Sequence, residues 1–429
     1  MEIRAFRGWR YAVSGGDVSP FIAPPYDVLT AADKAELLAR SERNIVAVDL
    51  PHVPPKEQGP EAEYAAAGRL LERWKASGVL AQDAAAALYV YEQAFEWQGG
   101  AYARRAMLCG VRATELGRDV IGHEHVFPGP LADRLRLTEH TRMQLSPIFG
   151  FYDDPGGRVA GMLAAAAAGP TVAHGELRGV AERLWMVTAP AAVAAVAAAL
   201  RDVQVFIADG HHRYTTARNY AAAAAARQNS GPDHEANFVM FALVARDDPG
   251  LLILPTHRIF SSLHPDGSVE ALAAASGEFD WRKCRGGPDV TTEYVEGLLA
   301  EAGPRAIALV SGKSATVWLV RLARPEAMRQ AAPEQIEEWR QLPPAILHKL
   351  IIERALHPWV VGELGVEYTP QTRQVLDACR SGRAQLGACL PPIAIGSVQA
   401  VARRGASMPH KSTYFYPKLA TGMVLKPLE

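Results

Sequence analysis

The feature that most constrains this chain is a short apolar run that leads through a single glycine into a helix-forming segment. Residues 203–208 predict a buried strand, and residues 214–226 predict a helix. The sequence Asp-Gly-His-His-Arg, at residues 209–213, lies between them. A strand that turns directly into a helix is typical of chains that mix the two elements. We therefore expect an α/β fold of the mixed α+β kind, with a functional site at this turn.

The chemistry of residues 209–213 suits a phosphate group. Gly210 allows a sharp turn and a close approach of a ligand to the backbone. The helix that follows offers free N–H groups and the positive end of its dipole, and Arg213 adds a fork of donors. His211 and His212 can donate hydrogen bonds, and Asp209 can bind a metal ion or orient a histidine. The alternative is a purely structural turn in which Asp209 caps the helix.

A second polar motif is Gly122-His123-Glu124-His125, followed by Arg134. A carboxylate such as Glu124, held in a pocket, can act as a general base toward a hydroxyl. His123 and His125 stand two residues apart, which leaves a metal clip open, although the motif is not His-Glu-x-x-His. An ordinary polar loop is the alternative interpretation.

A third motif lies near the C-terminus, where residues 408–418 combine prolines, aromatics and basic side chains. Lys411, together with the hydroxyls of Ser412 and Thr413, predicts a grip on a phosphate or another anion. The alternative is a C-terminal strand with a basic surface.

Changes of pattern along the chain predict four regions. Residues 1–85 form an N-terminal α/β region, in which Thr30 and Asp33 predict the start of a helix. Residues 86–264 form the core, with strands around a turn at 98–100 and the motif at 209–213. Residues 265–360 form an inserted lobe with a hairpin and helices, and residues 361–429 return to the active site.

Charge and composition exclude several classes of protein. The 45 basic and 46 acidic residues give a net charge of −1, so no global attraction to nucleic acid is expected. The four cysteines form no Cys-x-x-Cys pair and suit neither zinc nor a disulfide framework. The first residues lack the apolar core of a signal peptide, and the alanine tracts are too weakly apolar for good membrane spans. We expect a cytoplasmic protein with no membrane or nucleic-acid partner.

Five stretches resemble a bacterial family known as domain of unknown function 1015, over nearly the whole chain. The matching stretches are residues 23–28, 89–93, 123–124, 207–213 and 411–418. The resemblance by itself implies no activity.

Three of these motifs, in the same order, also resemble the archaeal free serine kinases of the ParB and sulfiredoxin superfamily. The matching motifs are His123-Glu124, residues 209–213 and residues 411–413. Two positions depart from that pattern, because Gly122 replaces a proline and Ser412 replaces a threonine. Regions 1–85 and 265–360 have no counterpart in the shorter kinases. The resemblance implies a ParB/sulfiredoxin-like core with additional N-terminal and C-terminal α/β lobes.

The kinase resemblance also implies a role for each matching residue. Glu124 would take the proton of the substrate hydroxyl, and Asp209 would act with Mg²⁺ or with that hydroxyl, so we place both with His211 in the catalytic group. The donor phosphates would be held by a set of backbone and side-chain donors: Gly210, His211, His212, Arg213, Lys411, Ser412 and Thr413. His123 and Arg134 are possible additions to the site.

The sequence thus predicts a small-molecule kinase. It would transfer a phosphate of ATP or ADP to the hydroxyl of free L-serine or of a similar metabolite, with Mg²⁺ as cofactor; CTP and pyrophosphate remain open as donors. One alternative is a nucleotide-binding switch of the ParB type, without catalysis or with slow hydrolysis. Another is a metal-dependent hydrolase that uses His123, His125, His211 and His212. If the protein oligomerises, we expect a homodimer.

Overall fold

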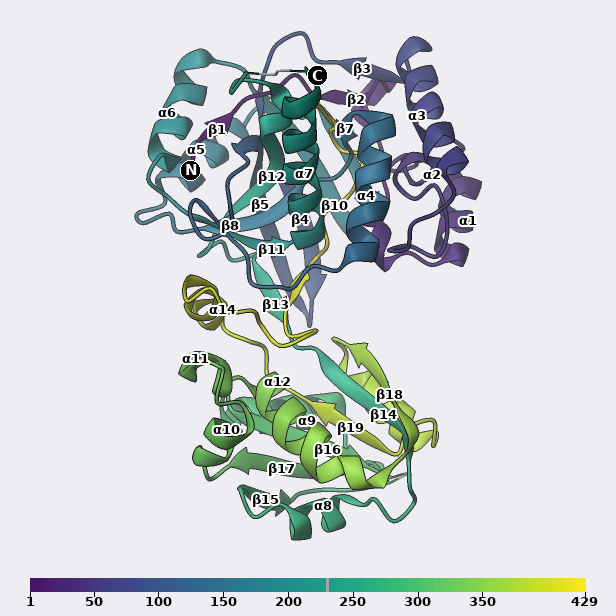
Figure 1. The fold of residues 1–429 in the computed structure, drawn as a ribbon, viewed down its shortest axis with the longest axis vertical. Helices are drawn as coiled ribbons and strands as arrows, with labels where there is room; N and C mark the ends of the chain where they lie inside the picture. Colours follow the sequence, from purple (N-terminus) through teal and green to yellow (C-terminus); the bar gives the residue numbers. More distant parts are fainter. Residues whose placement is uncertain (229–230, 313) are drawn as a thin grey trace. The chain divides into compact units, whose positions relative to one another are not determined.

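The computed structural model describes residues 1–228, 231–312 and 314–429, and the chain divides into two compact units. The first unit contains residues 1–252 and 417–429, and the second contains residues 253–416 (Figure 1). Helices and sheets occur in both units, which confirms the predicted mixed α/β class. The finer division into four regions and the ParB/sulfiredoxin-like core remain predictions.

The first unit is built on a nine-stranded sheet with the order β6-β11-β8-β12-β5-β4-β10-β9, in which β1 also pairs with β5. Its strands are β1 (Ile3–Arg4), β4 (Leu88–Trp97), β5 (Gly100–Arg112), β6 (Val120–Ile121), β8 (Ile148–Tyr152), β9 (Ala173–Leu177), β10 (Val180–Val187), β11 (Val205–Asp209) and β12 (Phe238–Ala245). Two smaller pairs join β2 (Trp9–Tyr11) to β3 (Leu80–Gln82) and β7 (Met143–Gln144) to β21 (Lys426–Pro427).

Helices of the first unit cover this sheet, and α4 and α7 pack side by side over it (Figure 1). The α-helices are α1 (Ala31–Arg40), α2 (Val46–Asp49), α3 (Glu61–Ala76), α4 (Pro128–Thr141), α5 (Arg158–Ala166), α6 (Pro190–Leu200) and α7 (His211–Gln228). Short 3₁₀ turns are η1 (Ser14–Gly16), η2 (Tyr26–Val28) and η3 (Glu235–Asn237). Thr30 and Asp33 form a reciprocal capping box at the start of α1, as the sequence predicts.

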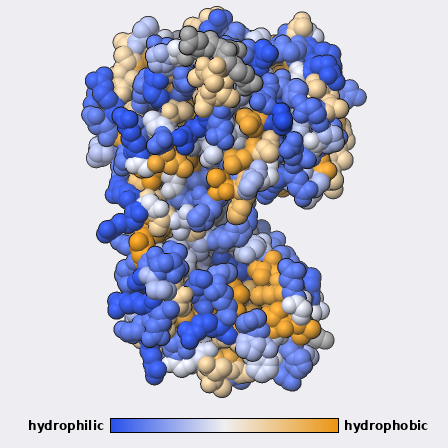
Figure 2. Space-filling model, viewed as in Figure 1, coloured by the Kyte–Doolittle hydropathy of each residue, from blue (hydrophilic) through white to orange (hydrophobic). Residues whose placement is uncertain are grey.

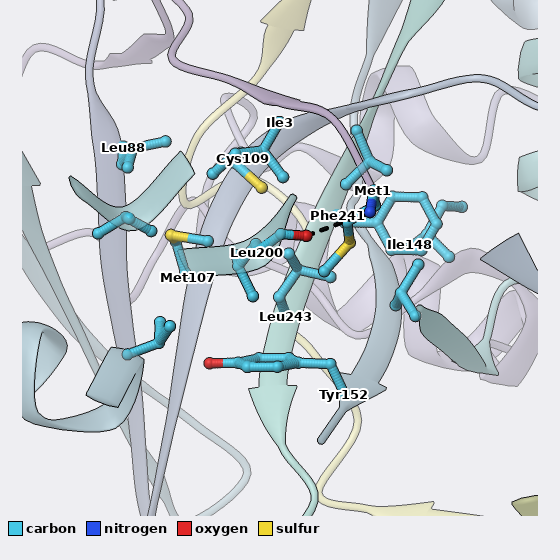
Figure 3. Close-up of a cluster of buried hydrophobic side chains, with 14 of the residues drawn as sticks. Met1, Ile3, Leu88, Met107, Cys109, Ile148, Tyr152, Leu200, Phe241 and Leu243 are labelled. Atoms are coloured by element: carbon cyan, nitrogen blue, oxygen red, sulfur yellow. Dashed lines mark hydrogen bonds between the residues drawn. The ribbon is translucent and has the colours of Figure 1, made fainter. Parts of the chain in front are cut away.

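Apolar residues of the sheet and of α5, α6 and α7 form the main core of the first unit. Buried side chains such as Leu88, Met107, Phe241 and Leu243 gather in it (Figure 3). The amino group of Met1 is also enclosed and donates a hydrogen bond of 3.1 Å to the carbonyl oxygen of Leu200. This close packing holds β8 and β12 beneath α7, and so supports the turn that leads into α7.

The second unit has its own six-stranded sheet, with the order β15-β17-β16-β19-β14-β18. Its strands are β14 (His257–Leu263), β15 (Phe279–Lys283), β16 (Ala306–Ser311), β17 (Thr316–Leu322), β18 (Val360–Thr369) and β19 (Leu386–Cys389), with β13 (Leu252–Leu254) and β20 (Tyr414–Tyr416) near the two ends of the unit. Its helices are α8 (Val269–Ala275), α9 (Thr292–Ala302), α10 (Glu326–Ala331), α11 (Glu337–Arg340), α12 (Pro343–Ile346), η4 (Leu347–Leu356), η5 (His357–Trp359), α13 (Thr372–Arg380) and α14 (Ile395–Arg403). The predicted hairpin of the inserted lobe is confirmed as β16 and β17.

Hydrophilic side chains cover most of the face seen in Figure 2, and hydrophobic side chains gather in a patch on the second unit. Within the described part of the chain, no helix combines the length and the apolar character needed to cross a membrane.

Candidate active site

The predicted strand-to-helix turn is present, with β11 ending at Asp209 and α7 beginning at His211. Gly210 connects them with a φ of +104°, a conformation that side chains other than glycine rarely adopt. A Cβ atom at this position would lie 3.0 Å from Nη2 of Arg213 and 3.1 Å from Cδ1 of Ile148. The glycine is therefore needed both for the backbone turn and for the close packing around it.

Parallel strand pairing brings the second motif to the same place. Strand β6 runs parallel to β11, with Val120 opposite Val205 and Ile121 opposite Phe206. Parallel strands end at the same edge of a sheet, so the residues that follow β6 lie beside the end of β11. Glu124 consequently reaches the first residue of α7.

Three groups from the two motifs form one chain of contacts. The backbone N–H of His123 donates a hydrogen bond of 3.0 Å to Nε2 of His211, and Nδ1 of His211 lies 3.1 Å from a carboxylate oxygen of Glu124. Since Nε2 accepts, the proton of a neutral His211 ring is on Nδ1, the nitrogen that faces Glu124. The contact between His211 and Glu124 has an ion-pair distance without hydrogen-bond geometry, and it places the Glu124 carboxylate beside the His211 ring.

Glu124 is partly open to solvent, because 45% of its side chain is exposed. Desolvation raises the pKa of Glu124, but His211, His123 and Lys418 together outweigh this effect and hold the pKa well below its usual range. The carboxylate is thus ionised at neutral pH and can accept a proton from a group that enters the site.

Asp209 forms an ion pair that the sequence did not predict. Nζ of Lys418 donates a hydrogen bond of 2.8 Å to one carboxylate oxygen of Asp209, and Nη2 of Arg213 lies 3.9 Å from the other. Burial raises the pKa of Asp209, but Lys418 and Arg213 lower it by a larger amount. The pKa of Asp209 therefore lies below its usual value. Asp209 is therefore also ionised, and a cationic side chain stands beside it.

A buried polar network fixes the backbone around Lys418. The side-chain amide of Gln93 donates a hydrogen bond of 3.0 Å to the carbonyl oxygen of Lys418, and the guanidinium of Arg104 donates one of 2.6 Å to that of Pro417. The backbone N–H of Ala420 donates to the hydroxyl of Tyr91, which in turn donates to Glu182 over 2.6 Å. These contacts with β4, β5 and β10 hold Lys418 where its amine reaches Asp209.

The other histidines contribute in different ways. Nε2 of His212 accepts a hydrogen bond of 2.9 Å from the backbone N–H of Phe127, and the two rings stack. Burial lowers the pKa of His212, which favours a neutral ring. His123 is buried, and desolvation lowers its pKa to about 3; neither ring nitrogen has a hydrogen-bond partner among the described residues. His125 is exposed.

The guanidinium groups of Arg213 and Arg134, which the sequence places in the candidate site, form hydrogen bonds with other parts of the protein. Nη1 of Arg213 donates to the hydroxyl of Ser146 over 3.1 Å and to the carbonyl oxygen of Pro147 over 2.6 Å. Arg134 is buried, and its guanidinium bonds to Asp133 and to the backbone of Asp49. Both guanidinium groups thus already have protein partners, and the predicted hold of Arg213 on a phosphate stays a prediction.

Residues 408–416 of the third motif belong to the second unit, whereas residues 417 and 418 belong to the first. The hydroxyl of Ser412 donates to the carbonyl oxygen of Pro409, and the carbonyl oxygen of Lys411 accepts a hydrogen bond of 3.0 Å from Arg258. Lys411 has a φ of +52°. The structure describes these residues within their own unit, so the grip of Lys411, Ser412 and Thr413 on a phosphate also stays a prediction.

The donor set around Asp209 bears on the expected Mg²⁺. Among the described residues, no group of three or more His, Cys, Asp and Glu side chains is arranged to hold a metal ion. Magnesium commonly binds one or two carboxylates together with substrate phosphates and waters. The ionised carboxylates of Asp209 and Glu124 fit that mode, whereas a closed cage of protein ligands is not present in this part of the chain.

Lys418 is the residue that sequence reasoning missed. It lies in the third motif, in which the hydroxyls of Ser412 and Thr413 favour Lys411 as the phosphate ligand instead. The useful signal was the Tyr-Glu-Gln segment at residues 91–93, since two of these side chains hold the backbone around Lys418.

Comparisons with solved structures return distant matches. A structure titled "Free serine kinase in complex with AMP" is 12% identical, with a TM-score of 0.34, and the match covers 74% of this chain and 92% of the other. A conserved hypothetical protein from Pyrococcus furiosus is 11% identical, with a TM-score of 0.35 and coverage of 75% and 95%. SbnI from Staphylococcus aureus, truncated at its C-terminus, is 13% identical, with a TM-score of 0.36 and coverage of 75% and 87%.

No curated protein matches the chain. A family model matches residues 3–343, which is most of the chain and includes Glu124 and the turn at 209–213. The family suggested by the sequence motifs is thereby confirmed: the chain belongs to the family described as Protein of unknown function (DUF1015).

Proposed function

We propose that this protein is a small-molecule kinase that transfers a phosphoryl group from ATP or ADP to the hydroxyl of free L-serine or of a similar small metabolite. The observation that carries the proposal is the position of Glu124. Its carboxylate is ionised and lies 3.1 Å from His211 at the start of α7, and its side chain is 45% exposed. A general base needs this combination of charge, access and position.

The surrounding groups suit the charge of a phosphate donor. The first turn of α7 offers backbone N–H groups and the positive end of the helix dipole. Lys418 adds a cation next to Asp209. We assign the phosphates to Gly210, His212, Arg213 and Lys418, with Lys411, Ser412 and Thr413 as further contacts. Mg²⁺, when bound, would neutralise charge on the phosphate oxygens.

The proposed reaction moves one proton and one phosphoryl group. The acceptor hydroxyl gives its proton to a carboxylate oxygen of Glu124, and its oxygen forms a bond to the terminal phosphorus of the nucleotide. The bond from that phosphorus to the bridging oxygen breaks, and the shortened nucleotide leaves with the electron pair. Because the phosphoryl transition state is loose, the proton can move late, so an ionised base of low pKa is sufficient when it is well placed.

The experiment that tests this function is phosphorus NMR of the full chain with Mg²⁺, ATP or ADP, and L-serine. A new phosphomonoester signal that requires serine is expected, and Glu124→Gln should reduce its rate of formation by a factor of roughly 10² or more. Glu115→Gln, which changes a carboxylate in the preceding loop, is the matched control and should keep the wild-type rate. Equal rates for Glu124→Gln and the wild type would refute the general-base role. If no nucleotide reacts, and the phosphorus signals of none are broadened by the protein, the kinase function is refuted.

A further inference from the structure

A half-open cavity of ≈ 50 Å³ lies in the first unit, beside the candidate active site. It is lined by residues of α2, α4 and α7, by residues 143–146, and by the first residues of β8 and β12. Arg213, Thr216 and Gln144 contribute polar groups to its lining, and Leu137 and Met240 are among its apolar residues. Glu124, Asp209 and His211 do not line it, so the cavity lies apart from the proposed general base, although it shares Arg213 with the proposed phosphate contacts.

Two polar groups of the lining lack a partner among the described residues. Oγ1 of Thr216 is buried without a hydrogen bond, although only 3% of the residue is exposed. Nε2 of Gln144 is also buried without a hydrogen-bond partner among the described residues. The Gln144 amide cannot turn over without loss, because its oxygen accepts a hydrogen bond of 2.5 Å from the backbone N–H of Met240. A buried polar group without a partner is costly and calls for a bound molecule.

These groups share one chemical character. The amide nitrogen of Gln144 can only donate, the hydroxyl of Thr216 can donate, and the guanidinium of Arg213 donates and carries a positive charge. Asp49 also lines the cavity, but it is paired with Arg134. Donors that converge around a cationic group favour an oxyanion, and the apolar side of the lining favours a short hydrocarbon.

We propose that this cavity binds a small organic carboxylate, with its carboxylate held by Thr216, Gln144 and Arg213 and its hydrocarbon part packed against the apolar lining. The volume has room for a few non-hydrogen atoms. Arg213 also lies 3.9 Å from Asp209, so an occupant that draws on its guanidinium acts on the charge beside the active site. The proposal does not depend on the kinase function.

Equilibrium dialysis of the full chain with ¹⁴C-propionate, without nucleotide, tests the proposal. We expect saturable binding that propionamide, which has no charge, does not displace. Thr216→Val has the same shape without the hydroxyl and should raise the Kd roughly tenfold. Ala217→Leu places additional carbon atoms in the cavity and should abolish binding.

Two control variants separate this site from other effects. Thr215→Val changes a neighbouring hydroxyl on α7 that does not line the cavity, and it should keep the wild-type Kd. Glu124→Gln should bind propionate normally even if it, or the wild type, fails as a kinase. Circular dichroism confirms that each variant is folded, and Gln144→Leu replaces Thr216→Val if the latter unfolds.

Three results would refute the proposed carboxylate site. If the folded wild-type protein binds no propionate, or if the cavity variant of Thr216 or Gln144 binds it as tightly as the wild type, the carboxylate site is refuted. A crystal structure grown with propionate that shows only ordered water in the cavity has the same meaning.

Discussion

Nζ of Lys418 lies 2.8 Å from a carboxylate oxygen of Asp209, although 209 positions separate the two residues in the chain. The contact joins the C-terminal segment of the first unit to the end of β11, directly before the turn into α7. It gives the candidate site a fixed cation beside an ionised carboxylate, and it depends on the polar network that holds residues 417–420.

Lys418→Met tests the importance of this cation. The substitution keeps a long side chain but removes the charge, so Asp209 loses its nearest partner and a bound phosphate loses a source of stabilisation. We expect kcat/KM for phosphoryl transfer to fall by a factor of roughly 10². Lys283→Met, at an exposed lysine of the second unit, is the control. Wild-type kinetics in Lys418→Met would show that the pair is only structural.

Arg213→Ala tests the predicted contact with phosphate. The variant loses the bonds to Ser146 and Pro147 as well as the charge near Asp209. We expect nucleotide affinity and turnover to fall together, each about tenfold, as measured by calorimetry and by steady-state kinetics. Ser146→Ala removes one of the same bonds without removing the charge, and it serves as the comparison. If nucleotide affinity is unchanged in Arg213→Ala, this residue does not hold the phosphates.

His211→Phe tests the orientation and the ionisation of Glu124. Desolvation raises the pKa of Glu124 and His211 is the first of the groups that lower it, so loss of His211 raises this pKa. The active form of Glu124 is the ionised one. As the pH is lowered, the variant therefore loses this form at a higher pH than the wild type does. In the pH profile of kcat/KM, the acid limb should move to higher pH. An acid limb that does not move would show that His211 does not lower the pKa of Glu124.

Lys411→Asn tests the predicted contribution of the third motif. Asparagine tolerates the positive φ of Lys411 better than most residues, so the backbone should be kept while the charge is removed. We expect the Kd for nucleotide to rise roughly tenfold in an equilibrium titration. An unchanged Kd would remove Lys411 from the phosphate site and leave Lys418 as the lysine of the C-terminal segment that acts there.

Glu182→Gln tests the network beneath Lys418 through the pH dependence of stability. Burial raises the pKa of Glu182 to about 7, despite the hydrogen bonds from Tyr91 and Gln93 that lower it. Between pH 4.5 and about 7, the folded state holds a proton that the unfolded state has released. The contribution of this proton to the free energy of unfolding is fully present below pH 4.5 and is lost as the pH rises toward 7. This loss amounts to about 3 kcal/mol.

The glutamine variant cannot release that proton. Urea unfolding between pH 4.5 and 7 should therefore show a flatter dependence of the free energy of unfolding in Glu182→Gln than in the wild type. Glu176→Gln, on the exposed part of the neighbouring strand β9, should keep the wild-type slope. Parallel slopes for Glu182→Gln and the wild type would contradict the raised pKa.

Local features of the chain were determined by the sequence itself. Gly210 between an apolar run and a helix-forming segment predicts the turn, because only a residue without a Cβ adopts its φ of +104° easily. Thr30 and Asp33 predict the start of α1, because their hydrogen bonds join residues three apart. The turn at residues 98–100 likewise joins β4 to β5. Each of these features depends on neighbours in the chain.

Only the tertiary structure decided which of the polar residues meet. The pairing of β6 with β11 brings Glu124 to His211, and the network of Tyr91, Gln93 and Arg104 selects Lys418 as the partner of Asp209. The same packing turns Arg213 toward Ser146 and encloses Thr216 in a cavity. Such contacts join positions far apart in the chain, and their geometry follows from strand order and the close packing of side chains, which local propensity does not encode.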